Sequence, residues 1–355
     1  MSWQGKAEDT GHIEELGAVQ GPSFSAKLKA HFRRFWWLHL IIFIACTLII
    51  VLCLIYVAFP HISQHDIDKS TLTVQSLILS NPTPDSFHLV QTSVIGNDSP
   101  YHPDLDAFNA SLSLDGRVPY AYIEIPAVHA TAQATTVVDQ DVTITDLDAF
   151  IEYNINVLQN EEVNLDVKGR TALHEMSFPT TNVDYNKTAT MKGLNNLTGF
   201  SITDFTIQLI PEADGTNMLG TVNIPNPSVM TLSMGNVTFN NYIGNTTDPA
   251  LYVGTTTLTN LTLVPGNNTI PMRSTVNQSL VLTQIVESYQ NGMLPISIVG
   301  NSSVFDGQHL VYFEKALSSV TQHVTLDVGK ALMEIGVNTS ALGGGGALPP
   351  PPLLL

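Results

Sequence analysis

Residues 35–59 read FWWLHLIIFIACTLIIVLCLIYVAF, an apolar stretch that contains no Asp, Glu, Lys or Arg. As an α-helix this stretch would span about 37 Å, more than the roughly 30 Å hydrocarbon core of a bilayer. Trp36 and Trp37 stand where the aromatic belt of a membrane interface is expected, and Pro60 is expected to end the helix. The sequence therefore predicts one transmembrane helix over residues 35–59.

The charges on either side of this stretch predict its orientation. Four basic residues precede it, namely Lys27, Lys29, Arg33 and Arg34, whereas two aspartates come before the first lysine that follows it. Positive charge is retained on the cytosolic side, so residues 1–34 are predicted to be a disordered cytosolic tail, with the rest of the chain lumenal. A cleaved signal peptide is disfavoured because a long polar leader comes first and the apolar run is about twice the usual length.

Glycosylation sequons support the same orientation. Eleven Asn-x-Ser/Thr sites follow the apolar stretch: Asn97, Asn109, Asn186, Asn196, Asn236, Asn245, Asn260, Asn267, Asn277, Asn301 and Asn338. All eleven lie on the predicted lumenal side, where N-glycosylation takes place. We treat them as glycosylation candidates, with Asn97 weakened by the nearby Pro100.

Composition excludes several classes of protein. The net charge is −17, which argues against nucleic-acid binding and suits an acidic compartment. Both cysteines, Cys46 and Cys53, lie in the apolar stretch, so the lumenal part has no disulfide. All three tryptophans come before residue 38, so an antibody-type immunoglobulin domain, which needs a core Trp and a Cys pair, is excluded.

Short alternating apolar runs dominate the lumenal part. Examples are Leu72 and Val74, then Val163, Leu165 and Val167. Each run predicts a strand with one buried face, and the Asn-, Gly-, Pro- and Asp-rich segments between the runs predict turns. The predicted fold class is therefore mainly β, an N-terminal transmembrane helix followed by antiparallel β-sandwiches.

An internal repeat divides the lumenal part into two units. Asn81-Pro82-Thr83 follows a strand in the first unit, and Asn226-Pro227-Ser228 does so in the second. Each unit also contains one short helix, and its apolar face is a candidate lining for a ligand groove. The candidates are Phe150, Ile151, Ile155 and Leu158 in the first helix and Leu282, Ile285, Val286 and Tyr289 in the second.

These features place predicted boundaries along the chain. Two sandwiches, each with a short helix, are expected at residues 66–175 and 190–312. Residues 313–337 mix helical and strand patterns and stay unassigned, and residues 338–355 are predicted to be a flexible Gly/Pro-rich tail.

The basic-flanked anchor, the two Asn-Pro-Ser/Thr turns and Gly266-Asn267-Asn268 together carry a family resemblance. The chain resembles fungal single-pass vacuolar membrane proteins with a domain of unknown function related to the type-two late-embryogenesis-abundant (LEA-like) β-sandwich. The resemblance implies tandem seven-stranded, immunoglobulin-like sandwiches and residence in a vacuolar or lysosome-like membrane. It also implies lipid binding between sheet and helix, and it supplies no catalytic residues.

No sequence pattern points to an enzyme, a cofactor or a metal centre. Asp9-Thr10-Gly11 spells the aspartic-protease triplet, but it stands in a polar tail without a second copy. His61 and His65 have the residue type and spacing of metal ligands, yet nothing fixes a helix past Pro60, so a solvated stalk is preferred. Paired aspartates such as Asp104 with Asp106 are interpreted as turn and cap residues, which leaves no catalytic residue, cofactor or metal in the prediction.

Two hypotheses of function remain open. In the first, the protein is a non-enzymatic vacuolar or endomembrane glycoprotein whose lumenal sandwiches bind a lipid or another lumenal ligand. In the second, it is a scaffold or regulator of a vacuolar membrane complex such as the proton pump, acting through lumenal contacts and the cytosolic tail. The plasma membrane is the alternative location, where a wall-binding role is disfavoured because the lumenal part has no Trp for stacking sugars.

Overall fold

The helix that carries the apolar stretch extends beyond it in both directions. The computed structural model describes residues 24–337 except 98, 100 and 177. Helix α1 runs over Phe24–Cys53, a π-helical turn over Leu54–Ala58 and α2 over Phe59–Lys69. Within these described residues, one helical run, His31–Lys69, is long and apolar enough to cross a membrane. Residues 24–34 are thus helical rather than disordered, and the predicted tails at 1–23 and 338–355 lie outside the described residues.

Pro60 does not end the helix, so that prediction was wrong. A proline in a regular helix removes one hydrogen bond and clashes with the carbonyl four residues earlier. Here the π-helical turn comes immediately before it, and the N–H of Phe59 donates to the carbonyl of Leu54, five residues back. The wider turn accommodates the proline ring, and the helix continues to Lys69.

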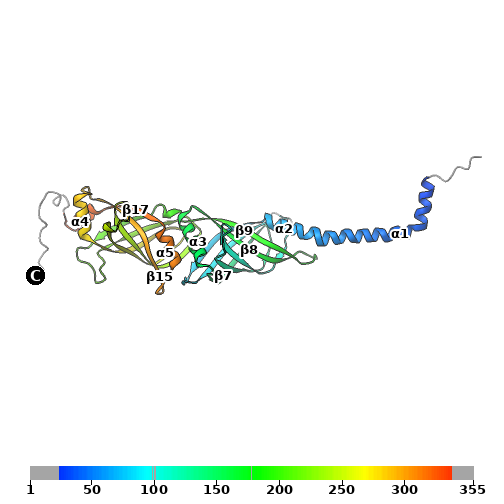
Figure 1. Cartoon of the computed structure of the whole chain (residues 1–355), viewed down its shortest axis with the longest axis horizontal. Helices are drawn as coiled ribbons and strands as arrows, with labels where there is room; N and C mark the ends of the chain where they lie inside the picture. Colours follow the sequence, from blue (N-terminus) through cyan, green and yellow to red (C-terminus); the bar gives the residue numbers. More distant parts are fainter. Residues whose placement is uncertain (1–23, 98, 100, 177, 338–355) are drawn as a thin grey trace, which may run out of the picture. The chain divides into compact units, whose positions relative to one another are not determined.

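The rest of the described chain is mainly β, as predicted (Figure 1). Its first strands are β1 (Thr71–Ser80), β2 (Ser86–Gly96), β3 (Asp104–Leu105), β4 (Phe108–Leu114), β5 (Ala121–Ile125), β6 (Val128–His129), β7 (Gln133–Thr143), β8 (Glu162–His174) and β9 (Thr181–Lys192). The later strands are β10 (Ser201–Ile207), β11 (Met218–Asn226), β12 (Met230–Ile243), β13 (Tyr252–Leu263), β14 (Gly266–Val276), β15 (Met293–Phe305), β16 (Gln308–His309) and β17 (Thr321–Asp327). Short helices are α3 (Leu147–Gln159), α4 (Gln278–Glu287), α5 (Val311–Ser318) and α6 (Val328–Glu334), with 3₁₀ turns at Asn195–Leu197 and Pro249–Leu251.

We call residues 60–194 the first β region. One layer is β1-β2-β7, and the other is β5-β4-β8, with β9 on the far side of β8. An isolated bridge between Ala121 and Ile144 joins the layers along one side, and β1 approaches β9 on the other. Helix α3 begins after Asp146, whose carboxylate accepts a hydrogen bond from the N–H of Ala149, and its apolar side enters the space between the layers.

We call residues 195–337 the second β region. Its strands form one strongly curled sheet in the order β10-β11-β14-β13-β12-β15-β17. The two outer strands, β10 and β17, approach each other, so the sheet nearly closes on itself. Helices α4 and α6 cover its end.

The two β regions share a sheet. Residues Leu77–Leu79 of β1 pair in parallel with Met230–Leu232 of β12, so β1 continues the sheet that β12 carries into the second region. The two Asn-Pro turns also lead to different connections. The turn at Asn81 closes a hairpin between β1 and β2, whereas β11 pairs with β14 rather than with β12, which follows the turn at Asn226. The sequence repeat is therefore local, and the strand pairing around it differs.

Side chains of the first β region fix α2. The ammonium group of Lys187 donates to the main-chain carbonyls of Ile67, Asp68 and Ser70 at the end of α2. The amide of Gln64 donates to the carbonyl of Asp184 at 2.9 Å and accepts from its N–H at 2.8 Å. A cation at a helix C-terminus satisfies carbonyls that have no partner in the helix.

The segment that the sequence left unassigned, 313–337, supplies the end of α5, β17 and α6. Helix α5 packs on α3 and on β15. At the contact with β15, a Cβ on Gly300 would lie 2.3 Å from the Cβ of Leu317, so only glycine permits this approach.

Candidate functional site: an apolar pocket in the second β region

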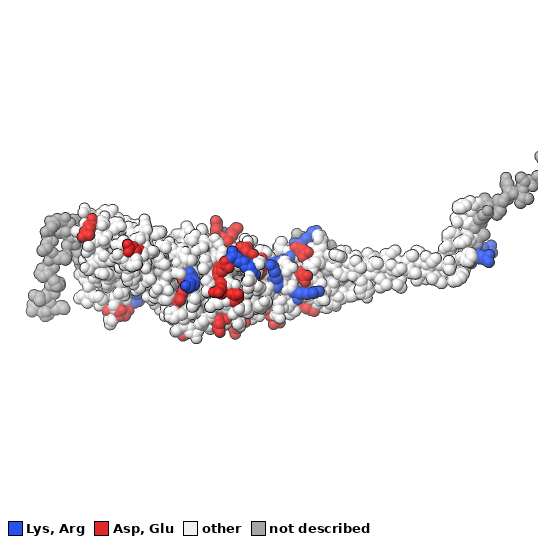
Figure 2. Space-filling view, viewed as in Figure 1, with Lys and Arg blue, Asp and Glu red and all other residues white. Residues whose placement is uncertain are grey.

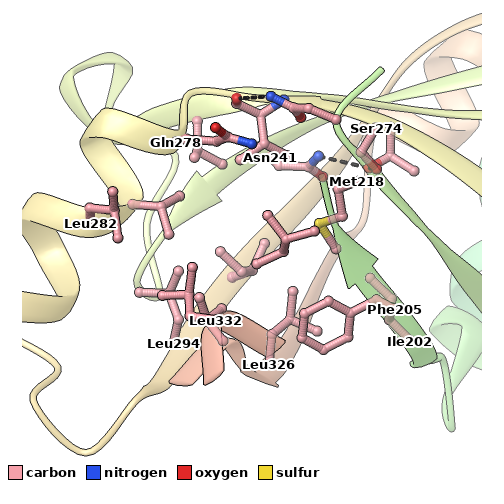
Figure 3. A pocket seen from close by; sticks show the side chains of 18 of the residues that line it. Ile202, Phe205, Met218, Asn241, Ser274, Gln278, Leu282, Leu294, Leu326 and Leu332 are labelled. Carbon is pink, nitrogen blue, oxygen red and sulfur yellow. Dashed lines mark hydrogen bonds between the residues drawn. The ribbon is translucent and has the colours of Figure 1, made fainter. Parts of the chain in front are cut away.

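The inside of the curled sheet is hollow. The space among the lining atoms, counted together with the open solvent at the mouth, amounts to about 830 Å³, and the centre of a water-sized molecule can move within about 80 Å³ of it. All seven strands of the curled sheet contribute to the lining, together with α4 and α6 (Figure 3). Among the described residues the lining is almost entirely aliphatic, with Phe205 as its single aromatic side chain and no charged residue.

The size of the side chains on α4 helps to explain why this interior stays open. In the first β region, α3 buries Phe150 and Tyr153, which fill the space between the layers with Tyr120 and Phe87. In the second, the buried side chains of α4 are Val281 and Ile285. Aliphatic groups on a short helix occupy much less volume than two aromatic rings, so space beside α4 is left unfilled.

Apolar side chains mark the mouth. Leu209 lines the pocket and is 56% exposed, and the adjacent Ile210 is 78% exposed. Both follow directly after β10, which is only half-buried along its length. An apolar ligand entering past this segment would meet little polar surface.

Five uncharged polar residues complete the lining: Asn217, Asn241, Thr256, Ser274 and Gln278. Asn217 is fully bonded, because its amide donates to the carbonyl of Val276 at 2.7 Å and accepts from the N–H of Val276 at 2.8 Å. The amide of Gln278 donates to the carbonyl of Gln208 at 2.6 Å. These two side chains therefore tie the loop after β10 and the start of α4 to the sheet.

The predicted groove residues are distributed over several places. Leu282 lines the large pocket, and Ile285, Val286 and Tyr289 do not. Phe150 lies beside a hollow of about 270 Å³ in the first β region, and Leu158 beside one of about 420 Å³ where α3 and α5 meet β12. Ile151 and Ile155 are half-buried on α3 and line none of these hollows.

A second, polar hollow lies on the outer face of β13 and β14. It is lined by threonines with Asp214 and Arg273. The guanidinium of Arg273 contacts Glu212 at 2.5 Å and Asp214 at 2.8 Å. The pKa of Asp214 is lowered to about 2, first by the hydrogen bond that the N–H of Thr216 donates to its carboxylate and then by Arg273. The one guanidinium is shared by two carboxylates, so this cluster has no unpaired positive charge to offer a ligand.

The aspartate pairs considered from the sequence bind histidines. Asp139 and Asp141 flank His88 at 3.2 and 2.8 Å and raise its pKa, the hydrogen bond that the His88 ring donates to Asp141 being the largest cause. Asp104 contacts His129 at 2.6 Å, and Asp106 contacts His174 at 3.0 Å. Over the described residues no group of three or more His, Cys, Asp or Glu side chains is arranged to hold a metal ion.

Ten of the eleven sequons lie among the described residues. Nine of these asparagines are exposed, as attachment of a glycan requires, and Asn338 lies outside the described part. Asn97 is buried and its amide donates to the carbonyl of Tyr101 at 3.1 Å, so a glycan would break that hydrogen bond. Asn277 caps α4 through its side-chain oxygen, which leaves its nitrogen available.

The pocket could not be recognised from one motif, because its lining is assembled from distant strands. One signal does exist in the sequence. The inward positions of β12 read Val237, Phe239, Asn241 and Ile243, and an amide in such an apolar row is unusual. The sequence interpretation passed over Asn241.

In comparison with known proteins, one family model matches part of the chain. A family model described as "Protein of unknown function (DUF3712)" matches residues 118–241, from just before β5 to near the end of β12. No curated protein matches.

Similar solved structures include bacterial adhesins. One is the adhesin from Mobiluncus mulieris containing disulfide, isopeptide and ester cross-links, with 11% identity, a TM-score of 0.19 and coverage of 66% of this chain and 81% of that one. Another is CfaE, the adhesive subunit of the CFA/I fimbria of enterotoxigenic Escherichia coli, with 10% identity, a TM-score of 0.18 and coverage of 74% and 87%. At such TM-scores these similarities carry no argument about fold or function.

Proposed function

We propose that this protein is a non-enzymatic, membrane-anchored lipid-binding protein whose second β region holds an apolar ligand inside its curled sheet. The observation that carries the proposal is the uncharged, aliphatic pocket of about 830 Å³ with exposed apolar side chains at its mouth. Empty apolar space is costly to keep, because the lining side chains lose packing contacts. A bound lipid would restore those contacts.

The location proposed for this activity is the lumenal side of a vacuolar or lysosome-like membrane, with the N-terminus in the cytosol. The basic flank before the apolar stretch supports the orientation. The exposure of nine sequon asparagines and the excess of acidic residues are compatible with an acidic lumen.

Photolabelling of the full-length chain in lipid nanodiscs tests lipid binding. An alkyl diazirine is expected to form adducts in the apolar stretch, which provides an internal positive control, and also on peptides from β10, β15 and α4 that line the pocket. The variant Ile296→Trp, which places a large ring in the pocket, should lose the pocket adducts and keep those in the apolar stretch.

Val137→Trp is the matched control, since it introduces the same ring at an exposed position of β7 outside the pocket. Its pocket peptides should carry the same amount of adduct as those of the wild type. If wild-type protein carried adducts in the apolar stretch alone, lipid binding by the second β region would be contradicted.

A further inference from the structure

One polar group inside the pocket has no partner. Asn241 is 6% exposed and lies on the inward side of β12, opposite Gly254 of β13 and Ile298 of β15. Its amide nitrogen donates to the hydroxyl of Thr256 at 2.8 Å, and that hydroxyl lies 2.8 Å from the hydroxyl of Ser274 (Figure 3). Its Oδ1 is buried and accepts no hydrogen bond from any described residue.

An unpaired carbonyl oxygen in an apolar interior is expensive. Removing it from water without a new hydrogen bond costs free energy, and buried polar atoms in folded proteins are nearly always paired. The other two side-chain amides in the lining are hydrogen-bonded, as buried amides usually are: Asn217 and Gln278 both donate to main-chain carbonyls. The amide nitrogen of Asn241 is held by Thr256, and Oδ1 is the atom of this side chain that stays without a partner among the described residues.

We propose that Oδ1 of Asn241 accepts a hydrogen bond from the hydroxyl group of a neutral lipid, such as a sterol or a long-chain alcohol, held in this pocket. The inference rests on the proposed lipid-binding function and specifies its ligand class. Asn241 is then the residue that positions the polar end of the ligand, while the aliphatic lining contacts its apolar body.

The chemistry of the lining selects this class. A fatty acid or phospholipid would bring a negative charge into a lining without Lys, Arg or His, where a buried charge has no partner. An ester or hydrocarbon lacks a donor, so Oδ1 would stay unpaired in its complex. A single hydroxyl satisfies the one free acceptor and adds no charge.

The first β region contains a matched control. Gln91 is also buried, its nitrogen donates to the hydroxyl of Ser93 at 2.8 Å, and its Oε1 has no partner among the described residues. The hollow beside Gln91 is about 270 Å³ and is bordered by Phe150 and Tyr153, so it is much smaller than the pocket at Asn241. Removing the amide of Gln91 should therefore leave lipid selection unchanged.

The experiment compares two photoprobes on the full-length chain in nanodiscs. One probe is a diazirine-bearing long-chain alcohol, and the other is its methyl ether, which has the same apolar body but no donor. The alcohol should label pocket peptides roughly three- to tenfold more than the ether, as one hydrogen bond predicts. In Asn241→Leu this ratio should fall to about one, and in Gln91→Leu it should stay at the wild-type value.

The outcomes separate the two proposals. If pocket peptides label equally with alcohol and ether in the wild type, the pocket binds lipid but the role of Asn241 is overturned. A diazirine-bearing fatty acid that labels the pocket more strongly than the alcohol would overturn the neutral ligand class. Absence of pocket labelling by every probe would overturn lipid binding and this inference together. The wild-type ratio decides the question even if Asn241→Leu fails to fold.

Discussion

The first β region packs a short helix between two layers of strands, and the second places one at the end of a single curled sheet; the two regions differ in what fills the interior. In the first, α3 places Phe150 between Phe87, Tyr120 and Tyr312, with ring centroids 4.9–5.3 Å apart. In the second, the buried side chains of α4, Val281 and Ile285, are aliphatic, and a pocket remains whose space amounts to about 830 Å³ with the open solvent at its mouth. The comparison teaches that the size of the side chains on a short helix contributes to the difference between a filled core and an open pocket.

The surfaces of the two regions differ as well. Residues 60–194 contain 18 acidic and 6 basic side chains, and residues 195–337 contain 9 and 3. Figure 2 shows the charged side chains gathered over the first region and a mostly uncharged face over the second. The second region carries seven of the ten described sequons, so we expect glycans, rather than charge, to keep it soluble.

The largest expected loss of stability comes from removing a buried ring from the first β region. Phe150→Ala removes a fully buried ring and should lower the free energy of unfolding by about 3–5 kcal/mol. Val281→Ala on α4 should cost clearly less, because Val281 already borders open space. Urea unfolding of the full-length chain in detergent micelles, followed by near-UV circular dichroism, measures both. Equal losses would show that the two interiors are packed alike.

Adding side-chain volume to the two interiors should change the free energy of unfolding in opposite directions. Leu89→Phe adds volume to the packed first region and is expected to destabilise it by about 1–3 kcal/mol. Leu326→Phe adds the same volume beside the pocket and should be neutral or stabilising by up to about 1 kcal/mol in protein without ligand. The same unfolding assay checks the pair. A large destabilisation by Leu326→Phe would mean that the pocket is closed in solution.

Removing amides from the pocket should separate a structural role from a binding role. Asn217→Leu breaks two hydrogen bonds to Val276 and should cost about 2 kcal/mol of unfolding free energy. Asn241→Leu loses one hydrogen bond but also removes an unpaired buried oxygen, so its change should stay within about 1 kcal/mol. Thermal unfolding of the two variants without ligand measures both losses of stability. If Asn241→Leu proved the more costly of the two, Asn241 would be a structural residue.

The smallest effect concerns charge in the first region. Asp141 and Asp139 raise the pKa of His88 above 6.5, so the folded state binds the proton more tightly than the unfolded state does. The stabilisation is therefore complete below pH 6.5 and is lost as the pH rises through the raised pKa. His88→Gln should reduce stability at pH 5.5 and change it little at pH 8, as followed by thermal unfolding at both values. A loss of the same size at both pH values would count against titration of His88.

Helices and strands that depend on a local pattern of residues were predicted from the sequence. The apolar positions Phe150, Ile151, Ile155 and Leu158 predicted α3, and alternation predicted β1 and the strand from Val163. The prediction that Pro60 ends the helix was wrong because a π-helical turn accommodates the proline. Such a turn depends on a change in main-chain hydrogen bonding that no residue type clearly indicates. Boundaries at 66–175 and 190–312 stay predictions, although the sheet shared by β1 and β12 joins the two parts.

The pocket was beyond prediction for a different reason. A void arises where side chains from seven strands and two helices fail to meet, and that depends on the curl of the whole sheet rather than on any one segment. Leu282 was predicted to line a ligand site and does line the pocket, while Phe150 fills a core. The one local clue was the amide of Asn241 in an inward apolar row.

Hydrogen exchange of the full-length chain in nanodiscs tests the central contrast most directly. The long-chain alcohol is expected to slow exchange in the pocket elements β10, β14 and α4, and to leave β1, β2 and α3 unchanged. Such a result would show that the second β region is a binding site and the first a filled core. Equal protection of both regions, or none in either, would contradict the account.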